Sequence, residues 1–204
     1  MKQETQTREN LLEVAKKEFM AKGYMGASLR NICKEAGVTT GALYFFFNDK
    51  EDLFGSLVAE SLNQINIYMK KHYQDELLFF AKSSLDNYDF AEDGEATREI
   101  VNYLFQYHDI FTLLLMKSSG SKYENCTDTF VELTQAHYRI LADRMTSYYK
   151  VERISDYTIH WFSHLQIFSF VQLITHNLTK EEAMKQMDTI VKFLTNGWFG
   201  MYKQ

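Results

Sequence analysis

The chain contains no proline, and its 204 residues include only nine glycines and two cysteines. β-Sandwiches and β-barrels need turn residues at short intervals, so this scarcity favours a protein built from helices. The two cysteines, Cys33 and Cys126, lie far apart and belong to no CxxC pair or Cys/His cluster. We therefore expect no disulfide scaffold, and we interpret both residues as reduced, buried thiols of a cytoplasmic protein.

A basic excess is also missing. The formal net charge is −5 and the sequence pI is about 5.7. Residues 1–54 hold eight Lys or Arg and eight Asp or Glu, so this segment is neutral. With this charge the chain would attract nucleic acid weakly at long range. Specific binding would depend on a few cations, hydroxyl groups and helix N-termini gathered on one face.

One long segment lacks charge without being typical of a membrane span. The stretch from Tyr157 to Thr179 contains no Asp, Glu, Lys or Arg and is long enough to cross a bilayer. It also contains many side chains that need hydrogen bonds, which are costly in lipid and easily satisfied against protein. We interpret it as a buried or subunit-interface helix, and we expect neither a membrane partner nor a secretory signal.

The first third of the sequence predicts four helices. Apolar residues at helical spacing indicate a helix over residues 5–22, followed by Gly23. Ser28 can cap a second helix that ends at Gly37, and Thr39 or Thr40 can cap a third that ends near Asn48. A long fourth helix then runs to about residue 72. Two short helices joined by a glycine-containing turn are typical of a helix-turn-helix, although a purely structural helical hairpin has the same pattern.

The exposed chemistry of the third helix favours DNA binding. Leu43 and Phe47 lie one turn apart on its predicted inner face, while its other residues point outward. Hydroxyl groups there can bind phosphates or base edges, a glycine allows close approach, and a lysine can add a cation beside the next helix N-terminus. The outward residues that carry this chemistry are Thr39, Thr40, Gly41, Tyr44 and Phe45, with Lys50 in the next helix.

Many residues of this region, at fixed spacings, resemble the N-terminal signature of the TetR family of bacterial transcriptional regulators. They are Phe19, Gly23-Tyr24, Ser28-Leu29-Arg30, Ile32, Ala36-Gly37-Val38, Gly41-Ala42-Leu43-Tyr44, Phe47, Lys50-Glu51 and Leu53-Phe54. The resemblance implies that Ser28, Thr39, Tyr44 and Lys50 contact DNA phosphates, and that Thr40, Gly41 and Phe45 face bases. Phe46 stands where the family usually has histidine, which replaces a polar side chain with one suited to packing.

The remaining sequence predicts further helices over residues 77–85, 96–107, 109–117, 123–149, 155–177 and 179–201, with a loop at 87–94. The last helix opens with a capping box, Thr179-Lys180-Glu181-Glu182. The many aromatic residues predict a core, part of which could line an effector pocket. Polar residues among apolar neighbours are the candidate anchors, although each is more often a satisfied core or interface group. The candidate ligand-binding residues are Gln106, Phe111, His137, His164 and Phe168, and Gln166 has the same character.

The last two predicted helices are apolar on more than one side, which indicates that a second subunit covers them and resembles the family's dimer interface. The residues proposed for that interface are Trp161, Phe170, Leu194 and Trp198. His160 and His164 lie one turn apart, but no third ligand follows from their spacing, so we expect no metal site.

The sequence thus predicts an all-α protein with two domains. Residues 1–50 would form a three-helix helix-turn-helix DNA-binding domain, and residues 51–204 a larger helical effector-binding and dimerisation domain. The predicted function is a cytoplasmic, homodimeric regulator that binds a double-stranded, inverted-repeat operator, most simply a repressor released by a small molecule. We expect no enzymatic activity and no cofactor. The alternative is a helical small-molecule binder or enzyme whose N-terminal unit is only structural.

Overall fold

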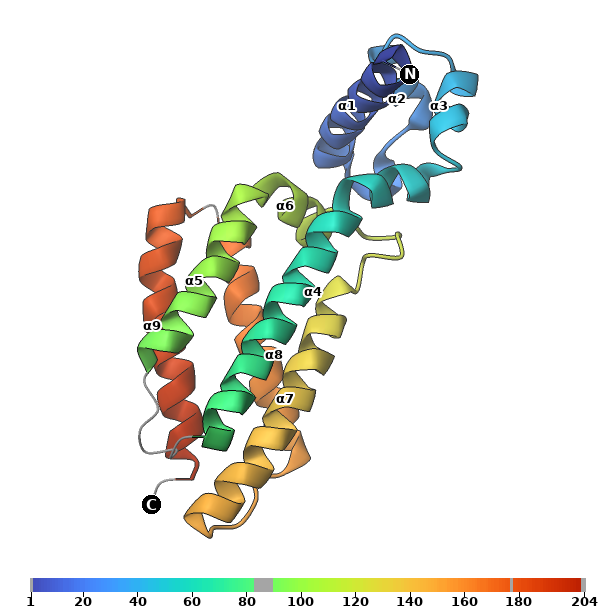
Figure 1. The fold of residues 1–204 in the computed structure, drawn as a ribbon. Helices are drawn as coiled ribbons and strands as arrows, with labels where there is room; N and C mark the ends of the chain where they lie inside the picture. Colours follow the sequence, from blue (N-terminus) through green and yellow to red (C-terminus); the bar gives the residue numbers. More distant parts are fainter. Residues whose placement is uncertain (1, 83–89, 177, 203–204) are drawn as a thin grey trace. The chain divides into compact units, whose positions relative to one another are not determined.

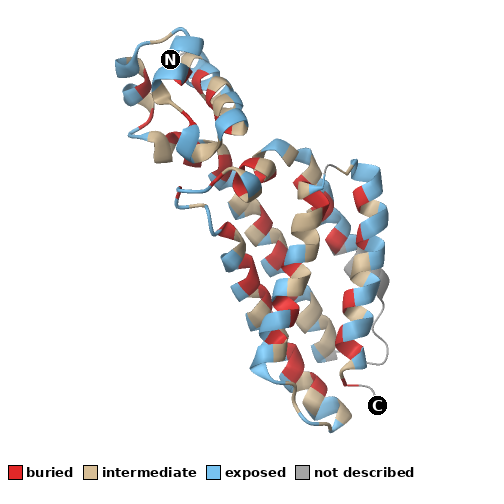
Figure 2. Cartoon of the chain, turned by 180° about the vertical axis from the view of Figure 1, so that it is seen from behind, coloured by how far each residue is buried: buried red, intermediate tan, exposed pale blue. Residues whose placement is uncertain are grey.

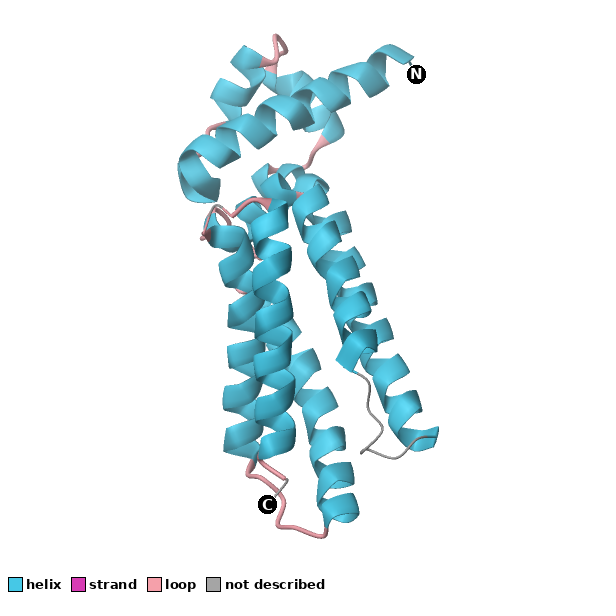
Figure 3. Ribbon diagram, turned by 90° about the vertical axis from the view of Figure 1, so that its left-hand side faces the viewer, coloured by secondary structure: helices cyan, strands magenta, loops and turns pink. Residues whose placement is uncertain are grey.

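The structure is a computed structural model that describes residues 2–82, 90–176 and 178–202, and within these ranges every regular element is a helix (Figures 1 and 3). The predicted all-α class is confirmed. The helices are α1 (Lys2–Gly26), α2 (Leu29–Glu35), α3 (Thr40–Phe46), α4 (Lys50–Lys82), α5 (Phe90–Gln106), α6 (His108–Met116), α7 (Cys126–Tyr149), α8 (Asp156–Thr175) and α9 (Lys180–Gly200). None of these helices is both long and apolar enough to cross a membrane.

Residue contacts divide the described chain into two compact units. Unit 1 consists of residues 1–64 and 107–126, and unit 2 of residues 65–106 and 127–204. These are units of packing, so the predicted functional boundary near residue 50 stays a prediction.

The core of unit 1 forms where α1, α2, α3 and the first turns of α4 meet. Leu11, Phe19, Leu43 and Phe54 are fully buried, and the rings of Phe19 and Phe54 meet edge to face with centroids 5.0 Å apart. α6 packs on α1. The carbonyl of Lys117, just after α6, accepts a 2.7 Å hydrogen bond from the Tyr24 amide. The short helices α2 and α3 therefore pack on a core that is rich in aromatic side chains.

Unit 2 is a helical bundle in which α5 and α8 both pack on α9 (Figure 1). One buried cluster contains Leu141, Ile159, Phe162, Leu194 and Trp198, and a second contains Val101, Leu173, Ala183 and Met187. Figure 2 shows buried residues recurring at intervals along the helices of this bundle, as expected for helices that bury part of their surface.

Two predicted helix ends were wrong. α4 continues without a break to Lys82 instead of ending near residue 72, since residues 73–82 contain no glycine or proline and Tyr73 extends the buried stripe of Ile65 and Met69. α5 begins at Phe90, inside the loop predicted at 87–94. Residues 91–96 are mainly good helix formers that outweigh Gly94. Residues 87–89 of that predicted loop lie outside the described ranges.

Candidate functional site

The turn between α2 and α3 has a fully hydrogen-bonded geometry. Gly37 adopts a left-handed backbone with φ +68°, which an L side chain rarely adopts. The amide of Gly37 donates to the carbonyl of Lys34 at 3.2 Å, and the amide of Val38 donates to that of Cys33 at 3.0 Å. These two bonds form the Schellman motif that ends α2. The angle between α2 and α3 therefore follows from one glycine and two backbone bonds.

Both helices begin at the residues expected from sequence. Ser28 caps α2, where its hydroxyl accepts from the amide of Asn31 at 3.5 Å, and Thr39 caps α3, where its hydroxyl accepts from the amide of Ala42 at 3.2 Å. Ser28 is further held by the 3.1 Å bond from its own amide to Oε1 of Glu18. The N-terminal amides of α3 are thus oriented outward beside the exposed Thr40 and Gly41.

The outward face of α3 is exposed, aromatic and uncharged. Tyr44 is 54% exposed and Phe45 is 72% exposed, whereas Leu43 and Phe47 are buried below them. α3 consists of Thr-Gly-Ala-Leu-Tyr-Phe-Phe, so it has no Arg, Lys, Asn, Gln, Asp or Glu. These side chains can contact DNA through hydroxyl groups and apolar surface.

Phe46 packs within an aromatic row. Its ring meets Phe45 edge to face at a centroid distance of 5.0 Å and lies 6.4 Å from the ring of Phe47. The guanidinium of Arg8 lies 5.3 Å from the centre of the Phe47 ring. The residue that replaces the family's histidine therefore supports the exposed Phe45 ring from the side.

Lys50 is less exposed than its predicted outward position implies. It is half-buried, its Nζ donates to the carbonyl of Met25 at 3.2 Å, and the same atom lies 4.8 Å from the centre of the Tyr24 ring. Burial lowers the pKa of Lys50, and the nearby carboxylate of Glu18 opposes that shift. Lys50 thus has a structural contact of its own beside its predicted contact with a phosphate.

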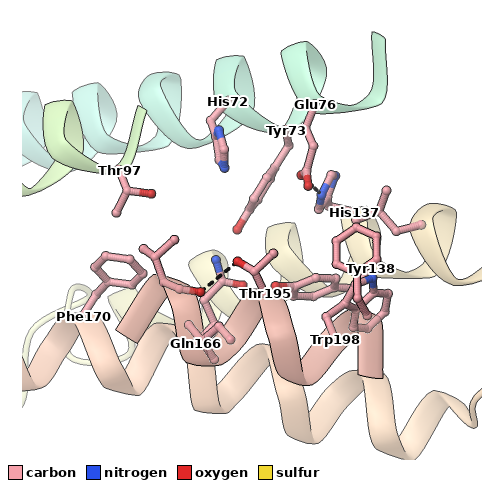
Figure 4. A pocket seen from close by; sticks show the side chains of 14 residues that line it. His72, Tyr73, Glu76, Thr97, His137, Tyr138, Gln166, Phe170, Thr195 and Trp198 are labelled. Carbon is pink, nitrogen blue, oxygen red and sulfur yellow. Dashed lines mark hydrogen bonds and ion pairs between the residues drawn. The ribbon is translucent and has the colours of Figure 1, made fainter. Parts of the chain in front are cut away.

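Unit 2 contains a partly open cavity of about 60 Å³ between α4, α5, α7, α8 and α9 (Figure 4). It is lined on the polar side by His72, Tyr73, Glu76, Thr97, His137, Gln166 and Thr195, and on the apolar side mainly by Tyr138, Phe170 and Trp198. A water molecule occupies about 30 Å³ of the liquid, so the cavity has room for a few non-hydrogen atoms and no more.

The structure brings few of the predicted ligand-binding residues to this cavity. His137 lines it, as does Gln166, whereas Gln106, His164 and Phe168 are exposed and Phe111 is buried in unit 1. The sequence-based prediction missed Glu76, which forms an ion pair with Nε2 of His137, because it ended the fourth helix at residue 72. The buried spacing of Met69 and Tyr73, at i and i+4, was the signal that could have extended the helix and revealed the pair.

The predicted interface residues fall into two groups. Leu194 and Trp198 are buried in the core of unit 2, where Trp198 packs against Phe162 and Tyr138. Trp161, by contrast, is 53% exposed on α8, and Phe170 is partly buried against Val101 and its neighbours. α8 and α9 expose three further aromatic residues, Tyr157, Phe168 and Phe193. An interface on these helices would therefore use Trp161 and the exposed aromatics and not Leu194 or Trp198.

His160 and His164 lie side by side on α8, with ring centroids 4.4 Å apart. Nδ1 of His160 is 3.3 Å from Oε1 of Gln135. Among the residues that the structure describes, no group of three or more His, Cys, Asp or Glu side chains is arranged to hold a metal ion.

The fold and the outward face of α3 define a helix-turn-helix protein with a helical C-terminal bundle. Residues 11–57 match the family model described as bacterial regulatory proteins, tetR family. The tetR-family match thus covers the helix-turn-helix and the helices beside it, and the curated relatives that resemble this chain are HTH-type transcriptional regulators.

Two bacterial relatives show how far the sequence similarity extends. The chain is 49% identical over 57 residues to the HTH-type transcriptional regulator AcrR of Shigella flexneri, covering 28% of this chain and 26% of AcrR. It is 41% identical over 56 residues to the HTH-type transcriptional repressor BepR of Brucella suis, covering 28% of this chain and 27% of BepR. The similarity therefore spans about a quarter of each relative and lies in one segment.

Solved structures extend the likeness to the whole fold. A transcriptional regulator from Aquifex aeolicus aligns with a TM-score of 0.58 at 20% identity, over 92% of this chain and 99% of that one. NalD, the secondary repressor of the MexAB-OprM multidrug efflux pump in Pseudomonas aeruginosa, aligns with a TM-score of 0.57 at 20% identity, over 98% and 96% of the two chains. At this identity the likeness establishes the fold alone.

Proposed function

We propose that this protein is a homodimeric transcriptional repressor that binds an inverted-repeat operator and is released by a small molecule. The observation that carries the proposal is the outward face of α3, with Tyr44 and Phe45 exposed above a buried core and the α3 N-terminus capped by Thr39. The match of residues 11–57 to the tetR family model supports it, because α3 lies within that segment. A regulator of this kind works in the cytoplasm.

The proposed contacts with DNA follow the chemistry of each side chain. Ser28, Thr39, Tyr44 and Lys50 would bind phosphates, which fix the position of the helix but carry no sequence information. Thr40, Gly41 and Phe45 would face base edges in the major groove. Since no side chain of α3 can form the bidentate bonds typical of arginine with guanine or of asparagine with adenine, its selectivity would come from hydroxyl and apolar contacts.

A dimer is proposed because two half-sites of an inverted repeat require two recognition helices related by a two-fold axis. The exposed aromatic residues of α8 and α9, Tyr157, Trp161, Phe168 and Phe193, support this proposal. Apolar side chains grouped in this way on two neighbouring helices are typical of a protein interface.

Release by a small molecule is proposed from α4 and the cavity. α4 is one continuous helix that carries Lys50 in its first turn and His72, Tyr73 and Glu76 in its second half. A ligand that favours one conformation of α4 would shift the population of DNA-binding molecules by its difference in affinity for the two states. A ligand larger than a few atoms would have to enlarge the cavity.

Selection of binding sites from random DNA with the purified full chain tests the proposal. We expect recovery of an inverted repeat, and loss of that binding in the Tyr44→Ala, Lys50→Ala double variant. Tyr148→Ala, which removes an exposed aromatic residue on α7, is the matched control and should bind as the unaltered protein does. Unselective recovery of DNA, or unchanged affinity of a folded double variant, would favour the alternative of a helical small-molecule binder.

A further inference from the structure

The exposed face of α8 forms one uncharged stripe. Residues spaced by four, three and four positions lie on one side of a helix, and the exposed residues with this spacing are Tyr157, Trp161, His164 and Phe168. His160 is exposed beside them. The sequence from residue 157 to the end of α8 contains no Asp, Glu, Lys or Arg. The stripe is therefore aromatic, with two imidazoles near its middle.

The two imidazoles lie close enough to share a metal ion. The ring centroids of His160 and His164 are 4.4 Å apart, and the ring planes meet at 71°. Histidines at positions i and i+4 on one face of a helix have a spacing that binds Zn²⁺. In a tetrahedral site with Zn–N distances of about 2.0–2.1 Å, two ligating nitrogens lie about 3.4 Å apart. Small side-chain rotations of these two rings can reach that separation.

Gln135 on α7 holds one of these rings in the form that can bind a metal. Oε1 of Gln135 lies 3.3 Å from Nδ1 of His160. An amide oxygen can only accept a hydrogen bond, so Nδ1 carries the hydrogen and Nε2 keeps the lone pair that a metal ion needs. Metal-binding histidines are usually oriented by such a bond from their other ring nitrogen. The contact between α7 and α8 therefore leaves Nε2 of His160 ready to act as a ligand.

The ligand set of one chain is half complete. A structural zinc site has four ligands, and His160 and His164 supply two, which is why the sequence of one chain predicts no site. In a two-fold dimer the same patch of both copies meets, so residues near the middle of the patch face their own copies. His164 lies in the middle of the stripe, between Trp161 and Phe168. Two copies packed stripe to stripe would therefore bring four imidazoles together.

We propose that His160 and His164 of two copies of this chain together bind one Zn²⁺ ion, and that the ion stabilises the dimer. Imidazole is a good ligand for zinc, and zinc accepts a tetrahedral set of nitrogens. The exposed rings of Trp161 and Phe168, on either side of His164, would pack around the bound ion. This inference rests on the dimer of the proposed function and adds to it a site that neither copy can form alone.

Isothermal titration calorimetry and sedimentation of the full chain with zinc chloride test the site. We expect one zinc ion to bind for every two chains. Zinc in excess of its dissociation constant should tighten the dimer by about tenfold or more, compared with the same protein in EDTA. Magnesium chloride should have no such effect, because magnesium prefers oxygen ligands. Failure to bind zinc would overturn the proposal, as would one zinc ion for each chain with unchanged assembly.

Substitutions locate the bound ion. His160→Gln and His164→Gln should each remove the effect of zinc on assembly, because each substitution removes two of the four ligands from the dimer. Gln135→Met should weaken zinc binding by about 10- to 100-fold, the usual cost of losing the partner of a ligating histidine. His176→Gln, at the exposed histidine that caps the C-terminus of α8, is the matched control and should bind zinc as the unaltered protein does. If folded His160→Gln and His164→Gln respond to zinc as the unaltered protein does, the ion binds elsewhere and the proposal is wrong.

The two proposals can fail separately. Zinc binding and assembly are measured without DNA, so a zinc-bridged dimer that binds no operator would contradict the proposed function alone. A dimer that binds its operator but does not respond to zinc would contradict this inference alone. If both hold, EDTA should weaken operator binding by the unaltered protein at low protein concentration and have less effect on His164→Gln.

Discussion

The ammonium of Lys50 donates to the carbonyl of Met25 at 3.2 Å and lies 4.8 Å from the centre of the Tyr24 ring. Tyr24 in turn donates from its hydroxyl to Oε2 of Glu51 at 2.9 Å, and burial together with this bond raises the pKa of Tyr24 to about 12. The start of α4 is therefore linked to the end of α1. Lys50, which is predicted to bind a DNA phosphate, therefore also connects α1 and α4.

The first prediction concerns Lys50. Lys50→Ala should weaken binding to all DNA sequences about equally and lower the salt dependence by about one unit, since one phosphate contact is lost. It should also destabilise the protein by about 1 kcal/mol, because the bond to Met25 is lost. Lys50→Arg should retain most of both properties. Salt-dependent binding assays and thermal unfolding of the same samples measure the two effects, and an unchanged salt dependence in folded Lys50→Ala would exclude the phosphate contact.

The second prediction concerns the base contact of Phe45. Because α3 offers an apolar ring and no bidentate donor, we expect Phe45 to contact a thymine methyl group. Replacing that thymine with uracil should weaken binding roughly fourfold, since a buried methyl group contributes about 0.8 kcal/mol. The same replacement should have no further effect on Phe45→Ala. The measurement replaces each thymine of a half-site with uracil in turn and compares the binding affinities. If no replacement weakens binding, Phe45 does not contact a thymine methyl group.

The third prediction concerns assembly. Trp161→Glu and Phe193→Glu should each convert a dimer to a monomer, because a charge would replace an exposed aromatic side chain on α8 or α9. Tyr148→Glu, on α7, should leave the dimer intact. Leu194→Glu should instead prevent folding, as it places a charge in the core of unit 2. Sedimentation measures the first three, and a monomeric unaltered protein at micromolar concentration would contradict the interface.

The fourth prediction concerns the capping box of α9. The Thr179 hydroxyl accepts from the amide of Glu182 at 3.2 Å, and the Glu182 carboxylate accepts from the Thr179 amide at 2.8 Å. Thr179→Ala should therefore cost about 1 kcal/mol near neutral pH.

This effect should depend on pH. Hydrogen bonds from Thr179 lower the pKa of Glu182 below 4.5, so its contribution is complete above pH 4.5 and is lost as the pH falls through the lowered value. The difference in thermal stability between the unaltered protein and Thr179→Ala should accordingly shrink in acid. A difference that stayed constant with pH would show that the 2.7 Å bond from the Thr179 hydroxyl to the Glu182 carboxylate contributes nothing.

Local sequence was enough to determine the helix-turn-helix and its caps. Ser28, Thr39, Gly37 and Thr179 each end or begin a helix through bonds to residues within four positions of themselves, so these capping roles depend little on the rest of the chain. Leu43 and Phe47 are likewise buried on one side of α3 because they lie four positions apart, about one helical turn. Fold class and the exposed face of α3 could therefore be predicted without a structure.

Only the tertiary structure determined which residues line the cavity and which apolar residues of α8 and α9 are buried or exposed. Trp161 and Trp198 look alike in sequence, but one is exposed and the other buried, because only the packing of the bundle selects which apolar side of a helix faces inward. A chain of hydrogen bonds runs from Tyr73 on α4 through the hydroxyl of Thr134 to the carbonyl of Phe130 on α7. No local pattern records such a chain, since its members come together only when the helices pack.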